Sequence, residues 1–247
     1  MIVVDGIAGL EPSHGPLFVV IGVFDGLHRG HAYLLEALVR EARARSARPA
    51  VITFDHHPDA VITGMAPPLL CDPAERLERL AAGGVEVTVV QHFDEATRRM
   101  PFDAFVREIA DRVALSGFLM TPESAFGRDR GGTPETVATL GRELGYDVVV
   151  VPTLEVDGQP VRSTDIRAAI ARGDLAEATR LLGRPYAVCG ALGHGRLVTE
   201  LPVAAPPPGA YRARLDGAPM DVAVGPEGEF RGLPAGQTAR ARLEFGA

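Results

Sequence analysis

The stretch Leu17–Phe24, LFVVIGVF, is an almost unbroken run of apolar residues in which β-branched side chains recur. Such a run is typical of a strand buried on both faces, as in the middle of a parallel sheet. Residues His28–Arg45 then carry leucine and alanine at helical spacing, and Ala50–Phe54 returns to a strand pattern. The order strand, helix, strand predicts a βαβ unit.

The same alternation continues to about residue 184, and the texture of the sequence then changes. The further predicted elements are strands Val85–Gln91, Ser116–Met120 and Asp147–Pro152, helices Phe102–Val113 and Pro134–Leu144, and helices that begin near Asp72, Ser163 and Asp174. From residue 186 onward, short apolar stretches are separated by PPPG, DGAP, GPEG and LPAG, which is typical of β-strands joined by turns. We therefore predict an α/β fold with a parallel-sheet domain, residues 1–184, followed by a small all-β module, residues 185–247.

The composition excludes several kinds of chemistry. All 25 basic residues are arginine, so Schiff-base catalysis, the Walker A loop and protein-kinase chemistry, which all need a lysine, are ruled out. The formal net charge of −7 argues against a duplex-binding surface, which needs clustered positive charge. We expect no nucleic-acid partner, and we expect any phosphate to be bound by arginine, histidine or backbone N–H groups.

Cysteine usage and hydropathy bear on the cellular setting. Cys71 and Cys189 are the only cysteines and form no CxxC pattern, so neither a disulfide framework nor a cysteine zinc site is indicated. The N-terminus lacks a basic signal-peptide region, and no apolar run approaches the length of about 18 residues that a membrane span needs. These features predict a cytoplasmic protein without a membrane span.

The segment Gly22–His31, GVFDGLHRGH, lies where the predicted buried strand turns into a helix. Ligands of open α/β sheets bind at the carboxyl ends of strands, often at the first such turn. His28 and His31 are three residues apart and so share one face of the first helical turn, beside backbone N–H groups without helical partners. Gly30 leaves no side chain to block a phosphate. The segment therefore predicts a polyphosphate site in which both imidazoles are donors.

Two other interpretations of this segment stay open. A single histidine near a helix start is commonly a cap or a surface residue. The spacing of the two histidines is also compatible with a zinc site, although no third ligand is placed nearby as in HExxH.

A second patch, Val161–Arg167, reads VRSTDIR and places Ser163 and Thr164 at a helix start. Their hydroxyl and N–H groups can bind an anion, and Arg167, near the end of the first turn, can reach back toward it. We expect this patch to close on the same phosphates. An ordinary capped helix with a surface arginine is the alternative.

Two loops are further candidates. The segment Thr53–Pro58, TFDHHP, follows the second predicted strand and should open on the same edge of the sheet. The loop Glu123–Gly132, ESAFGRDRGG, can present Phe126 for stacking and arginines for a phosphate. A plain turn and a plain surface loop are the alternatives.

In this order, GVFDGLHRGH, TFDHHP, AFGRDRGG, VRSTDIR and GDLAEATRLLGRPY resemble the prokaryotic bifunctional riboflavin kinase/FAD synthetase family, over about residues 15 to 195. HxGH alone marks only the wider nucleotidyltransferase superfamily, whereas the GDxxEAxxLLGRPY ending is more specific. The resemblance implies a Rossmann-like adenylyltransferase domain followed by a six-stranded β-barrel kinase domain. It also implies that ATP, with Mg²⁺, adenylylates FMN to give FAD and pyrophosphate.

The resemblance also implies roles for individual residues. His28, His31 and Arg167 would act on the ATP phosphates as the catalytic residues. The nucleotide pocket would be shaped by Gly22, Phe24, Asp25, Gly26 and Gly30, with Ser163 and Thr164 closing on the triphosphate and with His57, Pro58, Phe126, Gly127 and Arg128 on the flavin side. Mg²⁺ would be held by phosphates and water, and the sequence names no metal ligand.

The chain departs from the family pattern in two places. The flavin-side loop of the family reads roughly GxDFxFG, whereas Thr121–Gly127, TPESAFG, lacks the first glycine and one aromatic residue. The kinase pattern GRxxGFPTAN is replaced by Gly195–Ala205, GRLVTELPVAA, without the Thr and Asn that serve ATP and Mg²⁺. We therefore predict an FMN adenylyltransferase with a truncated, kinase-like barrel that has lost kinase activity. A nucleotidyltransferase for another phosphorylated small molecule and a non-catalytic flavin- or nucleotide-binding protein are the alternatives.

Overall fold

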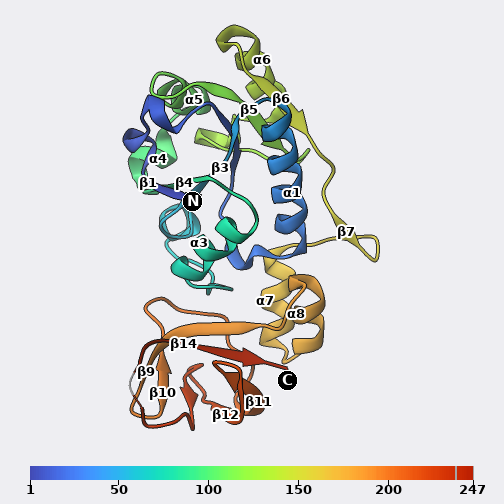
Figure 1. The fold of residues 1–247 in the computed structure, drawn as a ribbon. Helices are drawn as coiled ribbons and strands as arrows, with labels where there is room; N and C mark the ends of the chain where they lie inside the picture. The colour runs from blue at the N-terminus through green and yellow to red at the C-terminus, as the bar shows by residue number, and fades with distance from the viewer. Residues whose placement is uncertain (237, 247) are drawn as a thin grey trace. The chain divides into compact units, whose positions relative to one another are not determined.

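The computed structural model describes residues 1–236 and 238–246 (Figure 1). The chain divides into two compact units, each described here by itself. Unit 1 comprises Met1–Phe24, His31–Pro67 and Leu77–Leu154, and unit 2 comprises Asp25–Gly30, Pro68–Arg76 and Glu155–Ala247. The domain boundary after residue 184 stays a prediction.

Unit 1 is built on a six-stranded sheet in the order β1-β4-β3-β2-β5-β6. The strands are β1 (Ile2–Asp5), β2 (Leu17–Ile21), β3 (Arg48–Phe54), β4 (Val87–Gln91), β5 (Leu115–Met120) and β6 (Asp147–Val150). Every neighbouring pair runs parallel, so the predicted fold class is confirmed. The edge strand β1, with only four residues, was not among the predicted elements.

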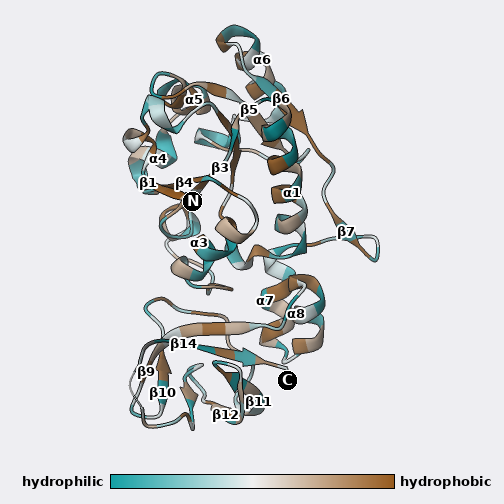
Figure 2. Cartoon of the chain, viewed as in Figure 1, coloured by the Kyte–Doolittle hydropathy of each residue, from teal (hydrophilic) through white to brown (hydrophobic). Residues whose placement is uncertain are grey.

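Helices cover this sheet and supply the rest of its core. The helices lying wholly or mostly in unit 1 are α1 (Arg29–Ala44), α2 (Asp59–Ile62), α3 (Pro73–Ala82), α4 (Glu95–Arg99), α5 (Phe102–Ala110) and α6 (Pro134–Leu144), with 3-10 turns η1 (Ile7–Gly9), η2 (Pro12–His14) and η4 (Arg128–Arg130). Figure 2 shows α1 alternating between hydrophobic and hydrophilic residues, as a helix with one buried face does. In the central strands, Val19, Ile52 and Val89 are at most 1% exposed.

The strand order contains one reversal of direction. From β2 the chain adds β3 and then β4 on one side, and it later adds β5 and β6 on the other side of β2. The carboxyl ends of β2 and β5 therefore flank the switch point of the sheet, where the connecting loops diverge and leave a crevice.

Unit 2 joins two helices to a closed barrel in the order β10-β13-β12-β11-β14-β9. Its elements are η3 (Asp25–Leu27), β7 (Glu155–Val156), β8 (Gln159–Pro160), α7 (Ser163–Ala171), α8 (Leu175–Leu182), β9 (Ala187–Gly193), β10 (Arg196–Val198), β11 (Gly209–Leu215), β12 (Ala218–Val224), β13 (Phe230–Arg231) and β14 (Thr238–Phe245). The predicted all-β module is confirmed. Its short strands close on themselves, so the barrel has no open edge.

The barrel core follows from residue alternation along the strands. In β11 and β12, Ala213, Leu215, Val222 and Val224 point inward while their neighbours are more exposed. Because successive side chains of a strand face opposite sides, this pattern fills the interior from both strands. The same apolar cluster takes in residues from α7 and α8, so barrel and helices share one core.

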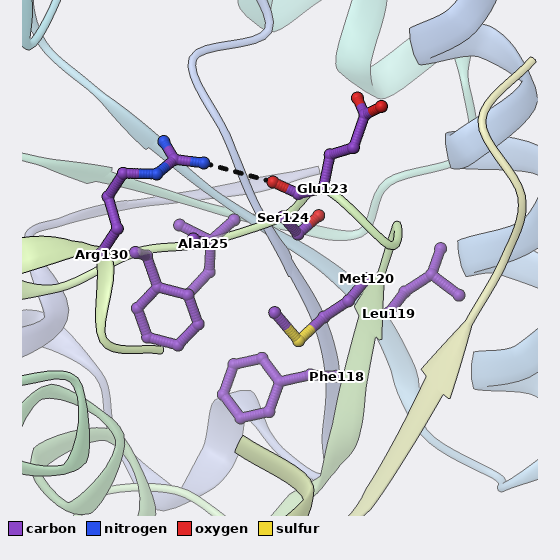
Figure 3. A pocket seen from close by; sticks show the side chains of 9 residues that line it. Phe118, Leu119, Met120, Glu123, Ser124, Ala125 and Arg130 are labelled. Atoms are coloured by element: carbon purple, nitrogen blue, oxygen red, sulfur yellow. Dashed lines mark hydrogen bonds between the residues drawn. The ribbon is translucent and has the colours of Figure 1, made fainter. Parts of the chain in front are cut away.

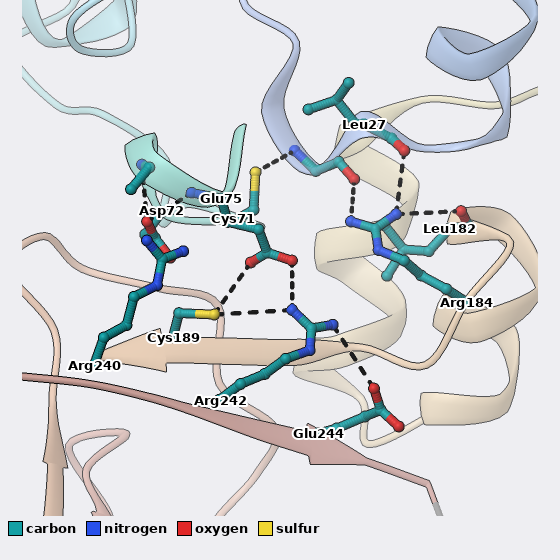
Figure 4. Close-up of polar contacts among 12 residues, drawn as sticks. Leu27, Cys71, Asp72, Glu75, Leu182, Arg184, Cys189, Arg240, Arg242 and Glu244 are labelled. Atoms are coloured by element: carbon teal, nitrogen blue, oxygen red, sulfur yellow. Dashed lines mark hydrogen bonds and ion pairs between the residues drawn. The ribbon is translucent and has the colours of Figure 1, made fainter. Parts of the chain in front are cut away.

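The segment Pro68–Arg76 belongs to this unit although it lies far from the barrel in sequence. Leu69 forms a parallel bridge with Val203. The buried Glu75 accepts a hydrogen bond from Arg242 of β14 at 2.6 Å (Figure 4). These contacts attach the segment to the barrel wall.

None of the described helices is both long enough and apolar enough to cross a membrane.

Candidate functional site

The turn between β2 and α1 has an unusual backbone. Phe24, Gly26 and Leu27 have φ angles of +54°, +73° and +35°. A non-glycine residue in a sparsely populated region costs about 1–3 kcal/mol and persists only where surrounding contacts hold it. Such residues are frequent at binding and catalytic sites.

Asp25 is the anchor of the turn in unit 2. Its side chain is only 3% exposed and pairs with the guanidinium of Arg167 at 2.5 Å. The same carboxylate accepts hydrogen bonds from the backbone N–H groups of Leu70, at 2.9 Å, and Cys71, at 3.3 Å. A buried carboxylate needs such pairing to offset the loss of hydration. Asp25 therefore links the turn to α7 and to the segment Pro68–Arg76.

The two predicted phosphate patches meet at this residue. The Ser163 hydroxyl donates to the backbone carbonyl of Asp25 at 3.2 Å, and Arg167 binds the Asp25 carboxylate from the same helix. Arg167 also donates from Nε to the carbonyl of Pro68 at 2.8 Å. Thr164 is exposed in the first turn of α7. Thus Ser163 and Arg167 lie at the turn, as expected, but the Arg167 guanidinium is already bound to protein acceptors.

His28 is a buried, neutral imidazole. It is 5% exposed, and burial together with the positive charges of Arg184 and Arg167 lowers the pKa of His28 from 6.5 to about 4. At neutral pH the ring therefore has one N–H donor and no charge. A Cβ added at Gly30 would lie 3.1 Å from this ring, so the missing side chain of Gly30 makes room for the imidazole.

Arg184 was not singled out in the sequence, yet it holds the same turn. Its guanidinium donates to the carbonyls of Gly26 at 2.6 Å and Leu27 at 3.1 Å, and to that of Leu182 at 3.4 Å (Figure 4). The only sequence signal for it is its place in the LLGRPY ending. The positive charge that it brings beside His28 favours both a neutral ring and a bound anion.

His31 and its neighbours belong to unit 1. The His31 ring lies in the first turn of α1 with its centroid 5.0 Å from that of Phe24, at an interplanar angle of 46°. A Cβ added at Gly22 would meet the Phe24 ring at 3.1 Å. Three of the predicted residues are therefore packed closely at the end of β2.

A cavity of about 240 Å³ lies at the switch point of the sheet (Figure 3). It is lined by Ile21, Phe118, Leu119, Met120, Glu123, Ser124, Ala125, Phe126 and Arg130. Apolar side chains from the ends of β2 and β5 line one part of it, and the loop after β5 adds the polar residues Glu123, Ser124 and Arg130. Arg130 donates to the carbonyl of Glu123 at 3.3 Å. Small-molecule sites combine apolar walls with polar groups that fix the orientation of the ligand.

Ile21 and Phe126 also line a second cavity, of about 50 Å³. The Phe126 ring contacts those of Phe118 and Phe105, with centroids 6.2 and 6.1 Å apart. Gly127 lines the second cavity beside it, as do Phe54 and Phe93. At about 50 Å³, this second cavity is the smaller of the two.

The other flavin-side candidates lie outside these two linings. His57 accepts a hydrogen bond at Nδ1 from the backbone N–H of Asp59 at 3.2 Å, and Pro58 precedes α2. Arg128 is exposed, 3.8 Å from the carboxylate of Asp129. The structure therefore leaves His57, Pro58 and Arg128 away from the cavity walls that Phe126 and Gly127 help to form.

Metal-binding capacity lies elsewhere in the described residues. Two groups could hold an ion: Asp55, His56 and His92 in unit 1, and Asp72, Glu75 and Cys189 in unit 2. In the turn itself, the Asp25 carboxylate is bound to Arg167 and to backbone N–H groups. The turn therefore does not offer Mg²⁺ a set of protein oxygen ligands of the kind it prefers.

Residues 10–165 match the family described as FAD synthetase. The chain belongs to the FAD synthetase family. It is 31% identical over 197 residues to the bifunctional riboflavin kinase/FMN adenylyltransferase of Pseudomonas fluorescens, covering 79% of this chain and 63% of that one. The corresponding Escherichia coli K12 protein is 33% identical over 179 residues, covering 72% and 57%. The chain therefore spans less than two thirds of the length of these two relatives.

Two further comparisons concern coverage and fold. A putative bifunctional riboflavin kinase/FMN adenylyltransferase of Geobacillus thermodenitrificans is 36% identical over 170 residues, covering 68% of this chain and 89% of that one. A solved structure described as a macrolide-efflux protein from Streptococcus pneumoniae aligns with 99% of this FAD synthetase family member, with a TM-score of 0.81 at 23% identity. That likeness is one of fold.

Proposed function

We propose that this FAD synthetase family member is an FMN adenylyltransferase, which transfers AMP from ATP to FMN and gives FAD and pyrophosphate. The observation that carries the proposal is the convergence of two sequence patches, 138 residues apart, on Asp25 through Ser163 and Arg167. Both patches carry groups suited to phosphate: imidazoles and backbone N–H groups in the first, and hydroxyls and a guanidinium in the second.

In the proposed reaction, a phosphate oxygen of FMN attacks the α-phosphorus of ATP in line. The bond from that phosphorus to the bridging oxygen of the β-phosphate breaks, and pyrophosphate leaves. His28 and His31 donate hydrogen bonds to the departing phosphates, while Arg167 supplies positive charge. Catalysis then consists of placement and charge stabilisation, with no covalent enzyme intermediate.

In the proposal, one set of residues binds ATP and a second set binds FMN. Gly22, Phe24, Asp25, Gly26 and Gly30 shape the turn that receives the nucleotide, and Ser163 and Thr164 cap the triphosphate. Phe126, Gly127 and the loop after β5 form the acceptor side, together with His57, Pro58 and Arg128.

Mg²⁺ enters the proposal as the counter-ion of ATP. Since the Asp25 carboxylate is bound to Arg167 and to backbone N–H groups, the phosphates and water would supply the ligands of the ion. Its chemistry is to neutralise charge that builds up on the phosphates. The buried thiols of Cys71 and Cys189 suit a reducing compartment, so we place the reaction in the cytoplasm.

We further propose that the barrel has no riboflavin kinase activity. Its stretch Gly195–Ala205 carries valine and alanine where the kinase pattern has Thr and Asn. Neither side chain can bind a phosphate or a metal ion, so the chemistry of that pattern cannot be performed there.

The test combines the purified full-length protein with ATP, Mg²⁺ and FMN and follows FAD by chromatography and pyrophosphate by a coupled assay. A parallel reaction contains riboflavin in place of FMN. FAD from FMN and no product from riboflavin support both proposals. Binding of FMN and ATP without pyrophosphate release would instead indicate a non-catalytic binding protein, and turnover only with another phosphorylated acceptor would change the substrate. FMN formed from riboflavin would overturn the loss of kinase activity.

A further inference from the structure

Two histidines and an aspartate meet at the carboxyl ends of β3 and β4. These strands pair in parallel with Phe54 opposite Gln91, so the next residues of each strand, Asp55 and His92, come side by side. The Asp55 carboxylate lies between two imidazoles: Oδ1 is 2.8 Å from Nδ1 of His56, and Oδ2 is in short contact with Nδ1 of His92. One oxygen and two nitrogens therefore face one another within 4.8 Å.

The second nitrogen of His56 is already fixed by the protein. Nε2 of His56 lies 2.9 Å from the carbonyl oxygen of Phe93. Because a carbonyl oxygen only accepts, Nε2 carries a hydrogen, and Nδ1 is the nitrogen that a metal ion would bind once its proton is displaced; metal-binding histidines are oriented in this way. The backbone N–H of Phe93 also donates to Asp55, at 3.2 Å, and so holds the carboxylate in place.

The partners of Asp55 distinguish this group from the other candidate in the described residues. In unit 2, Glu75 is paired with Arg242 at 2.6 Å, and Asp72 with Arg240 at 3.4 Å, so arginine already neutralises both carboxylates (Figure 4). The partners of Asp55 are the two imidazoles and backbone N–H groups. A cation can displace protons from imidazoles, whereas it cannot remove the charge of an arginine.

We propose that Asp55, His56 and His92 bind a divalent transition-metal ion of the Zn²⁺ class. Two imidazole nitrogens and one carboxylate oxygen are the donors of open zinc sites, in which a water or another ligand completes the coordination. Mg²⁺ prefers oxygen ligands, so this ion is distinct from the counter-ion of ATP. The side chains are accessible, with exposures of 34%, 34% and 65% in the order Asp55, His56, His92.

An ion bound by these three residues would also affect the nearby 50 Å³ cavity. Asp55 follows Phe54 and His92 precedes Phe93, and both phenylalanines line the 50 Å³ cavity. A bound ion would clamp the loops after β3 and β4 together and fix the aromatic wall of that cavity.

Calorimetric titration of the chelator-treated, full-length protein with ZnCl₂ at neutral pH tests the proposal. We expect one Zn²⁺ per chain with micromolar or tighter affinity, and at least tenfold weaker binding in Asp55→Asn and in His92→Ala. His194→Gln, at an exposed histidine of the barrel unit, is the matched control and should bind as the parent does. Equal affinity in the parent and in His92→Ala, or no binding by the parent, would overturn the site.

Co²⁺ provides a second readout. The parent should give the visible absorption of Co²⁺ held by nitrogen and oxygen ligands, and His56→Ala should lose it. Circular dichroism of each variant separates loss of ligands from loss of folding. Since neither titration contains ATP or FMN, failure of this site and failure of the proposed adenylyl transfer are distinguishable.

Discussion

Asp25 and His28 are buried polar residues of one turn, and the protein stabilises them in opposite ways. The Asp25 carboxylate is paired with a guanidinium, whereas His28 loses its charge because burial and two nearby arginines disfavour the imidazolium. An aspartate whose partner was removed would leave an uncompensated charge inside the protein. Replacing each residue therefore tests a different property of the turn: its stability for Asp25, and its catalytic role and protonation for His28.

Asp25→Ala should lower the free energy of unfolding by about 3–5 kcal/mol, because it leaves Arg167 without its buried partner. The measurement is urea unfolding followed by circular dichroism. Asp165→Ala, at an exposed aspartate of α7, is the control and should change stability by less than about 0.5 kcal/mol. If the two variants were equally stable, the buried pair would not be what holds the turn.

His28→Ala should lower the rate of FAD formation on the order of 10²-fold or more, since a positioned donor to a developing charge is worth that much. Circular dichroism and the midpoint of thermal unfolding check that the fold is intact. A near-normal turnover number in the purified variant would remove His28 from the catalytic role.

His28 also predicts how stability depends on pH. Its pKa is about 4 in the folded protein and near 6.5 in the unfolded chain, so the unfolded chain binds more protons between these values. Stability should therefore fall as pH drops from about 6.5 to 4, by on the order of 3 kcal/mol from this group. His28→Gln has no titrating ring at this position. Between pH 6.5 and 4, its free energy of unfolding should therefore fall by less than that of the parent, the difference being about the 3 kcal/mol that His28 contributes. Parallel curves for parent and variant would contradict the lowered pKa.

At the level of elements, the turn depends on the segment just after α8. Arg184, two residues past the end of that helix, donates to two carbonyls of η3 and is one of the charges that lower the pKa of His28. Three parts of the chain thus contact the strand-to-helix turn and stabilise it: Arg184, α7 and the segment Pro68–Arg76. Each of these is distant in sequence, so local propensity cannot by itself produce the positive φ angles.

Arg184→Ala should raise the pKa of His28, because one of the two positive charges that disfavour the imidazolium is gone. The pKa is read from the pH titration of the His28 ring protons by NMR. Arg172→Ala, at an exposed arginine after α7, is the control and should leave that titration unchanged. A midpoint that does not move in Arg184→Ala would show that the charge of Arg184 does not contribute to the lowered pKa of His28.

At the level of the whole molecule, the barrel and the helices that precede it are one packed unit. Leu70, Ile166, Ile170 and Leu182 share a core with barrel residues such as Val188. The predicted division after residue 184 marks a change of sequence texture, and the core of unit 2 continues across it. The all-β module that the sequence pattern defines is therefore smaller than unit 2, which packs α7, α8 and the segment Pro68–Arg76 together with the barrel.

A shortened chain of residues 1–184 should be markedly less stable than the full chain, because it exposes the apolar faces of α7 and α8 and loses Tyr186, which is 1% exposed. The expected signs are a lower thermal midpoint and binding of a hydrophobic dye. If the shortened chain unfolded at the same temperature as the full chain, residues 1–184 would be stable without the barrel, and the shared core would not contribute to their stability.

The sequence by itself determined the parts that depend on local pattern. Helix α6 begins and ends at the predicted residues, and α8 runs from its cap at Asp174 to Gly183, because periodicity, caps and glycine are all local signals. The buried β2 and the all-β character of residues 185–247 were likewise predicted from apolar runs and turn residues. The positions of His28, Ser163 and Arg167 could be singled out for the same reason.

Only the tertiary structure decided what those side chains contact. That Arg167 is bound to Asp25 and that Arg184 holds η3 both depend on segments far apart in sequence meeting in one core. The charge of His28 depends on the same meeting, because burial and neighbouring charge, not residue type, set its pKa. Periodicity and caps are properties of a few neighbouring residues, whereas desolvation and pairing exist only once the chain has folded.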